Sequence, residues 1–210
     1  MDLLGFGDAA EDALLATFRE IMAVEVVDGV SFDLKGLRIE AIREEVEYGG
    51  SRLRTTAALA GARIPITVDI GFGDAVEPGV EDIDLPVLLN MPSPHLRAYP
   101  LETVIAEKFH AMVVLGRANS RLKDHYDVWM LTSAFVEPER LRPAIVATFS
   151  RRNTVVPAVL PDGLSEVFAT DPAKQRQWDA FAGNLSGPIP EFGLVVGELR
   201  QRLKVFLAPI

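Results

Sequence analysis

The chain is 210 residues long, with 49% apolar and 24% charged residues, which indicates an ordinary globular protein that can bury a sizeable core. It has no cysteine, which excludes disulfides, a thiol nucleophile and cysteine-ligated zinc, and it has no apolar run near the roughly twenty residues of a membrane helix, so we expect a cytoplasmic protein without a membrane contact. The formal net charge of -9 argues against a protein that coats nucleic acid through Lys and Arg, but it is compatible with a local basic pocket for one nucleotide or one RNA end.

The first residues have the pattern of a strand that runs into a helix. Leu3 and Leu4 are typical of the end of a buried strand, and Gly5–Gly7 predicts a tight turn. Asp8 followed by Glu11 predicts a capping box, in which two side chains satisfy free N–H groups at the start of a helix. Apolar residues follow at helical spacing: Leu14, Leu15, Phe18, Ile21 and Met22.

The string GFGDA occurs twice, each time shortly after an aspartate, Asp2 or Asp69. One interpretation is two similar glycine turns that follow strands. The other is that Asp2 and Asp69 end neighbouring strands and jointly hold a divalent cation through carboxylate oxygens, as in phosphoryl-transfer sites.

A strand-rich segment lies between the two strings. The runs Leu53–Leu59 and Ile64–Ile70, separated by a turn around Gly61, predict a β-hairpin with one wet face. In the second run the isoleucines and Val68 alternate with polar residues, so Asp69 points away from the core. Pro65 places this strand at an edge or near its start. An earlier alternation predicts a further strand through Leu37, Ile39 and Ala41.

The next segment delivers the chain to the helices. It is predicted to contain an acidic, proline-bearing loop over Val76–Leu85 and short strands at Val87–Leu89 and Leu96–Tyr99.

Two helices are predicted in the middle of the chain. The first has Pro100 at its start, Glu102 in its first turn and Gly116 just past its end. The second opens at Asn119 or Ser120 as N-cap. The apolar surface of the first helix is wide enough to bury most of it, through Val104, Ile105, Phe109, Ala111, Met112 and Leu115. The second helix has its apolar side at Leu122, Tyr126, Trp129 and Met130.

Lys108 lies on the first helix among these apolar residues, where an ammonium needs a partner or a function. Asp124 and Asp127 project from neighbouring turns of the second helix, and Lys123 can reach Asp127 at i,i+4. Because the connecting loop is short, the two helices should pack nearly antiparallel and bring Lys108 near both acids. Two interpretations remain open, an ion pair that neutralises an aspartate between packed helices and a group that takes part in chemistry.

The last third of the chain is predicted to be helical. Helices are expected at Glu139–Arg151, Leu164–Phe168, Asp171–Phe181 and Phe192–Leu207, with Asp171 as an N-cap. Four basic residues could line an RNA-facing surface, although solvated helix faces explain them at least as well: Arg151, Arg152, Lys174 and Arg176.

The strings A-E-K-F and R-x-K-D-x-Y-D-V-W around the two central helices resemble the third motif of the nucleotidyltransferase-like toxins of the AbiEii/AbiGii family, the toxin half of type IV toxin-antitoxin pairs in bacterial phage defence. The matching residues are Glu107, Lys108, Arg121, Lys123, Asp124, Tyr126 and Asp127. Other stretches resemble this family in the same order, namely Asp2–Asp8, the strand around Arg52 and Arg54, Val68–Asp74 and Tyr99–Trp129.

The resemblance implies an α+β fold, with a nucleotidyltransferase-like mixed sheet core in residues 1–99 and a helical domain in residues 100–210. It also implies transfer of a nucleotide from an NTP to a hydroxyl of tRNA or protein, with Mg²⁺ as the cofactor and a cognate antitoxin as a partner. Lysine would act there by stabilising phosphate charge, because phosphoryl transfer relies mainly on positioning and electrostatics.

The same resemblance assigns roles to single residues. Asp2 would be the second aspartate of a D-x-D pair and Asp69 the third acid, and both would be metal ligands. Lys108 would be the phosphate contact, with Asp124 and Asp127 as catalytic or nucleotide-binding acids. The remaining expected nucleotide contacts are Glu107, Arg121, Lys123 and Tyr126.

The sequence departs from the family at its first motif. That motif begins upstream with a glycine-containing segment and a first aspartate, whereas this sequence starts at the position before Asp2. Either the start is assigned too late or the protein is a truncated relative. In the second case we expect an inactive module that binds a nucleotide or an antitoxin, and an exposed sheet edge that a homodimer could cover.

Overall fold

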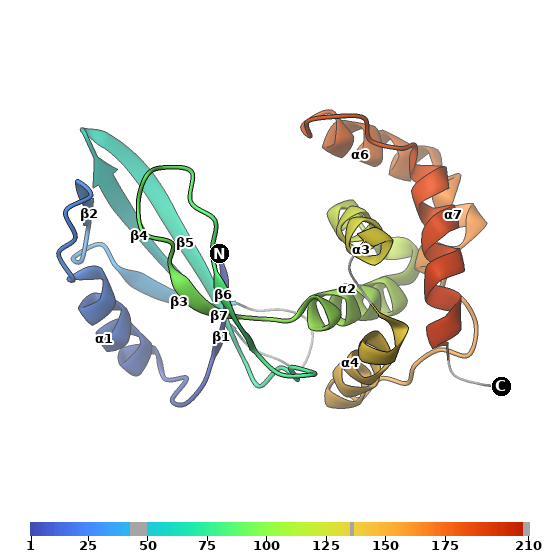
Figure 1. The fold of residues 1–210 in the computed structure, drawn as a ribbon, viewed down its shortest axis with the longest axis horizontal. Helices are drawn as coiled ribbons and strands as arrows, with labels where there is room; N and C mark the ends of the chain where they lie inside the picture. Colours follow the sequence, from blue (N-terminus) through green and yellow to red (C-terminus); the bar gives the residue numbers. More distant parts are fainter. Residues whose placement is uncertain (43–49, 135–136, 208–210) are drawn as a thin grey trace. The chain divides into compact units, whose positions relative to one another are not determined.

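The computed structural model describes residues 1–42, 50–134 and 137–207 (Figure 1). The chain forms two compact units, Met1–Asp74 and Ala75–Ile210, and the division falls earlier in the chain than the expected boundary after residue 99. The first unit contains a mixed sheet with a helix, and the second is mainly helical. This combination confirms the predicted α+β class.

The first unit is built on a five-stranded sheet with the order β1-β5-β4-β2, in which β3 also pairs with β4. Its strands are β1 (Asp2–Gly5), β2 (Val30–Phe32), β3 (Arg38–Ile42), β4 (Gly50–Leu59) and β5 (Ala62–Phe72). β1 runs parallel to β5, whereas the other pairs are antiparallel. β2 and β3 share one edge of β4 because they pair with opposite ends of that long strand.

The hairpin of β4 and β5 has the predicted position and turn. Leu59 pairs with Ala62, and the two residues between them, Ala60 and Gly61, have φ values of 48° and 86°. Such left-handed residues match the twist of a tight hairpin, and glycine adopts them without strain. Pro65 pairs with Thr56 of β4, and within the described residues no strand pairs with it on its other side, in agreement with its predicted place at an edge.

One helix, α1 (Glu11–Met22), covers one face of this sheet (Figure 1). Leu14 packs there with buried residues of the sheet and its loops, namely Leu37, Leu53, Val68 and Ile70. Leu15, Phe18 and Met22 add partly buried contacts. Ile21 lies near the end of the helix, where its side chain is 58% exposed.

The predicted capping box was wrong. Ala10 is the N-cap, with no side-chain cap bond, so Glu11 is the first helical residue rather than the third. Asp8 instead accepts a hydrogen bond from the Ala10 N–H at 2.9 Å, which is a turn before the helix and not a cap within it.

The second unit opens with a two-stranded sheet of β6 (Glu81–Asp84) and β7 (His95–Ala98). β6 occupies part of the predicted acidic loop, and the strand predicted at Val87–Leu89 does not form. Leu88 in that segment is fully exposed. The availability of a partner strand therefore decided which segment became a strand. Glu81–Asp84 pairs with β7, whereas Val87–Leu89 has no partner strand in the described part of the chain.

The helices of this unit enclose the larger core. They are α2 (Leu101–Leu115), α3 (Leu122–Ala134), α4 (Pro138–Arg151), α5 (Glu166–Ala169), α6 (Pro172–Ala182) and α7 (Phe192–Leu203). α2 packs against both α3 and α4 (Figure 1). The large side chains at its centre are fully buried, among them Phe109, Met112, Phe149, Phe168 and Trp178.

Several predicted helix features are confirmed. Every α4 residue that has its side chain buried was at the predicted helical spacing: Leu141, Ala144, Ile145, Thr148 and Phe149. Asp171 caps α6 by accepting hydrogen bonds from the N–H groups of Ala173 and Lys174 at 2.7 and 3.3 Å. Helix propensity and cap chemistry are local, which is why the sequence alone placed them.

Other expectations for the helices need correction. α3 begins at Leu122, because the Asn119 side chain accepts from the Arg121 N–H at 2.8 Å in a turn before the helix. Met130 and Leu115 are 42% and 38% exposed, respectively, so neither belongs to a buried face. α5 begins only at Glu166, after a 3-10 turn at Asp162–Leu164, and α7 ends at Leu203, before another 3-10 turn at Lys204–Phe206.

Candidate functional site

The predicted meeting of Lys108 with two aspartates is present in the second unit. Lys108 Nζ donates to Asp124 Oδ1 at 2.6 Å and lies 2.9 Å from Asp127 Oδ2. Lys123 Nζ donates to the same Asp127 oxygen at 2.5 Å. The three inner side chains are 14–21% exposed, whereas Lys123 is 68% exposed. We call these four residues the lysine centre.

The charge state of the lysine centre follows from its contacts. Burial by itself would lower the pKa of Lys108, but the hydrogen bonds and charges of Asp124 and Asp127 outweigh it, and the pKa is raised above its usual value. Lys108 is therefore an ammonium at neutral pH. An ammonium has three N–H donors, and the two carboxylates engage two of them.

Glu107, the neighbour of Lys108 on α2, faces a different partner. Arg152 Nη2 lies 3.4 Å from Glu107 Oε1, and its Nη1 lies 3.5 Å from His110 Nδ1. Burial and then the charge of Arg152 lower the pKa of His110 to about 4, so the imidazole is neutral at pH 7. Because arginine can only donate, Nδ1 accepts and Nε2 donates to Thr154 Oγ1 at 3.0 Å. Glu107 is thus part of a fixed network.

Two more expected nucleotide contacts have other surroundings. The Tyr126 ring packs among aromatic side chains, with ring centres 5.7 Å from Phe181 and 6.1 Å from Trp129. The Arg121 side chain is exposed next to the first turn of α3, where Asn119 holds its backbone N–H.

Lys174, one of the four basic residues weighed as an RNA-facing surface, has structural partners. Its Nζ donates to the Asn119 carbonyl at 2.7 Å and lies 5.3 Å from the centre of the Phe168 ring.

In the first unit, Asp2 and Asp69 are register partners in the parallel pair β1/β5. Their side chains therefore project from the same face of the sheet, as expected for acids that act together. Asp69 also pairs with Arg52 of β4, whose Nε and Nη2 donate to its two carboxylate oxygens at 2.6 and 2.7 Å. This bond, more than the charge of Arg52, lowers the pKa of Asp69, against an opposing effect of burial.

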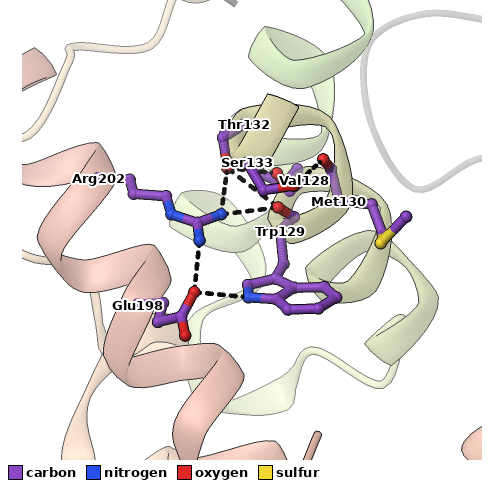
Figure 2. Close-up of polar contacts among 7 residues, drawn as sticks. All are labelled: Val128, Trp129, Met130, Thr132, Ser133, Glu198 and Arg202. Carbon is purple, nitrogen blue, oxygen red and sulfur yellow. Dashed lines mark hydrogen bonds and ion pairs between the residues drawn. The ribbon is translucent and has the colours of Figure 1, made fainter. Parts of the chain in front are cut away.

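A third polar network joins α3 to α7, and the sequence had no signal for it (Figure 2). Trp129 Nε1 donates to Glu198 Oε2 at 2.9 Å, and Arg202 donates to the Trp129 carbonyl at 2.8 Å and to Thr132 Oγ1 at 3.2 Å. Arg202 also pairs with Glu198. A cavity of about 520 Å³ lies beside this network, lined by Leu194, Gly197, Glu198, Gln201 and Arg202.

The comparison with protein families concerns the chain as a whole. A family model described as nucleotidyl transferase AbiEii toxin, type IV TA system, matches residues 1–203, which is almost the whole chain. The chain belongs to the AbiEii toxin family. The family resemblance given by the motif around Lys108 and Asp124 is thereby confirmed. No curated protein and no solved structure matches the chain.

The AbiEii resemblance implies a divalent cation at Asp2 and Asp69, and the chemistry of these residues fits one. Carboxylate oxygens are the ligands that Mg²⁺ prefers. The Arg52 guanidinium on both oxygens of Asp69 acts as a stand-in cation, which indicates that this position holds positive charge. Within residues 1–42, 50–134 and 137–207 there is no group of three or more His, Cys, Asp or Glu that could hold a metal ion.

The helices of the described residues do not meet the requirements of a membrane span. None of them, over the described residues, combines the length and the apolar character needed to cross a bilayer.

Proposed function

We propose that this AbiEii family protein transfers a nucleotide from an NTP to a hydroxyl group of tRNA or of a protein. The observation that supports this proposal is the lysine centre, in which Lys108 is held between Asp124 and Asp127 at 2.6 and 2.9 Å on the two helices that carry the family motif.

Lys108 is well suited to contact a phosphate. It stays charged at neutral pH, and the two aspartates fix the direction of its side chain. A positioned cation stabilises the charge that develops on a transferring phosphoryl group, and it does so with little reorganisation during the reaction. Lys123, which is mostly exposed and tied to Asp127, would bring a second cation to the same phosphates.

Asp124 would have a different role. It holds Lys108 and is 14% exposed, so it can orient the ammonium without being hydrated like a surface carboxylate. Mg²⁺, when bound by Asp2 and Asp69, would neutralise phosphate charge. An antitoxin would be the natural protein partner, since the family is described as part of a type IV TA system.

A second function is favoured by one observation. Arg52 engages both oxygens of Asp69, which would prevent Asp69 from binding a metal ion in this state. The chain would then bind a nucleotide or an antitoxin without catalysing transfer.

The test is incubation of the purified chain with each labelled NTP, magnesium and total bacterial tRNA. Lys108→Ala should abolish label transfer, whereas Lys204→Ala, which removes the same charge at an exposed position outside the lysine centre, should retain it. Asp124→Asn keeps the shape of the side chain and should also lose transfer, which guards against a folding defect in Lys108→Ala.

The other outcomes separate the two functions. No transfer, together with heat protection by an NTP that Lys108→Ala loses, would favour the binding module. Neither transfer nor protection would mean that Lys108 is an ordinary ion pair between packed helices, and the proposal would be wrong.

A further inference from the structure

Four charged residues of the first unit lie in one row across its sheet. Glu40 of β3 is opposite Arg52 of β4, Arg52 is opposite Asp69 of β5, and Asp69 is opposite Asp2 of β1. Paired residues of neighbouring strands project to the same side, so the four side chains share the sheet face that points away from the core. The core face is formed by the residues between them, such as Leu53 and Val68.

Arg52 is the cation at the centre of this row. Its two bonds to Asp69, at 2.6 and 2.7 Å, engage both carboxylate oxygens in a fork that suits a guanidinium. The negative charges of Glu40 and Asp2 act on the same guanidinium from the two sides. Any divalent cation that binds Asp69 must therefore use oxygens that Arg52 already holds.

We propose that Arg52 competes with the divalent cation for Asp69, so that the ion binds the Asp2–Asp69 pair only when the guanidinium has left it. This inference rests on the proposed function for its metal site, but it concerns how that site is controlled. Arg52 is thus a residue that sets the affinity of the site for its ion, and it does so by occupying the ligand.

The surroundings of Arg52 allow the exchange. Its side chain is 36% exposed and lies on the polar sheet face, so it can turn without breaking a core contact. Glu40, on its other side in the row, already pairs with Arg38 and Arg54, but its carboxylate is 49% exposed, so the guanidinium can move toward it or into solvent. A divalent ion and a guanidinium at one carboxylate also repel each other, so binding of the ion itself favours the departure of Arg52.

The experiment measures Mn²⁺ binding to the full chain by the loss of the free-ion EPR signal. Arg52→Gln removes the competing charge and should lower the Kd for Mn²⁺ about tenfold or more, the scale expected when a hydrogen-bonded ionic competitor is removed. Arg54→Gln is the matched control. Arg54 lies two residues along the same strand, on the same face, and its Nε is 3.5 Å from Glu40; its charge acts on Asp69, but among the described residues it donates no hydrogen bond to Asp69.

Further variants make the result specific. The Kd of Arg54→Gln should stay within about twofold of the parent, because long-range charge effects are screened at moderate ionic strength. Adding Asp69→Asn to Arg52→Gln should remove the gain. Arg52→Lys keeps the charge but loses the two-pronged contact, and it should give an intermediate Kd even if Arg52→Gln folds poorly.

Three results would overturn the inference: an unchanged or weaker affinity in Arg52→Gln and Arg52→Lys, an equal gain in Arg54→Gln, or no Mn²⁺ binding in any variant. The first two would leave the proposed nucleotide transfer intact, because that function is tested by label transfer and by Lys108. If the parent chain transferred no label but Arg52→Gln bound Mn²⁺ tenfold more tightly, the proposed function would be contradicted and the inference on Arg52 would stand.

Discussion

The two units of the chain each place a cation against carboxylates, but in different environments. In the helical unit Lys108 is 21% exposed and bonds two aspartates, whereas in the sheet unit Arg52 is 36% exposed and bonds one. A half-buried ammonium needs several acceptors to offset its lost hydration, whereas an arginine on an open sheet face keeps part of its water. We therefore expect the first contact to be a fixed part of the fold and the second to be exchangeable.

The helical unit also has a larger buried core than the sheet unit. The helical unit encloses a continuous set of fully buried aromatic and aliphatic residues, whereas the sheet unit buries Leu14, Leu37, Leu53, Val68 and Ile70 under one helix. The lysine centre thus lies on helices with the larger core, whereas the row of Glu40, Arg52, Asp69 and Asp2 lies on a sheet with a smaller core.

The largest expected effect comes from this difference in cores. Phe149→Ala should lower the free energy of unfolding by about 4 kcal/mol, because Phe149 is 1% exposed and packs on Phe109 and His110. Leu14→Ala should cost about 2 kcal/mol, since Leu14 is 8% exposed under a single helix layer. Urea unfolding, with amide exchange to assign the unit, measures both. A greater loss for Leu14→Ala would contradict the comparison.

The next effect tests the lysine centre itself. Lys108→Met should cost about 3 kcal/mol, because it leaves two mostly buried carboxylates without their shared cation. Lys123→Met should cost less than about 0.5 kcal/mol, since Lys123 is exposed and contributes a surface pair. The measurement is urea unfolding followed by tryptophan fluorescence, which reports on this unit because both tryptophans, Trp129 and Trp178, belong to it. Equal losses of unfolding free energy in Lys108→Met and Lys123→Met would mean that the burial of Lys108 does not make its ion pairs more important for stability.

The two units should lose stability at different pH values as the solution is acidified. Burial lowers the pKa of His110 to about 4 and also lowers that of His125. Below about pH 6.5 these histidines are therefore protonated in the unfolded chain but stay neutral in the folded unit. The helical unit should therefore lose on the order of 2 kcal/mol as the pH falls from 6.5 to 4. His110→Gln should remove part of this loss, which is measured by tryptophan fluorescence in urea at pH 7 and pH 5.

The sheet unit should respond at lower pH. Residues 1–74 contain no histidine, and the bond from Arg52 lowers the pKa of Asp69. The stability from this pair is present above the unfolded pKa of about 4 and is lost only as the pH falls below it. Amide exchange, corrected for its intrinsic pH dependence, should show β4 and β5 unchanged between pH 6.5 and 5. A parallel loss in both units would contradict the comparison.

The smallest effect concerns Arg52 and stability. Arg52→Gln should lower the urea midpoint of the sheet unit slightly, and the difference should shrink in high salt because the pair is partly exposed. Arg54→Gln should have no measurable effect, since its contact with Glu40 is longer, at 3.5 Å, and joins side chains that are 41% and 49% exposed. A large, salt-independent loss in Arg52→Gln would mean that Arg52 is a fixed structural residue like Lys108.

Features that depend on local signals were predictable. The limits of α2, the cap at Asp171 and the hairpin turn at Gly61 follow from proline, aspartate and glycine at defined positions. The contact of Lys108 with Asp124 and Asp127 was also predictable, because a short loop between two helices leaves few ways to pack them.

Features that depend on distant partners were not. Met130 has the same spacing as a core residue but is exposed, while His125 on the same helix is fully buried and near the Gly163 carbonyl. The bond of Trp129 to Glu198 joins residues far apart in the chain, and no periodicity indicates it (Figure 2).

From the sequence, the resemblance of its motifs to a known family implied the α+β class and the family, and helix spacing with a short loop predicted the contact of Lys108 with the two aspartates. Only the tertiary structure decided that Arg52 holds Asp69, since strand register brings together residues that alternation places on one face but does not pair. That pairing depends on the register of β4 against β5, and so the sequence could name Asp69 without showing that it already has a partner.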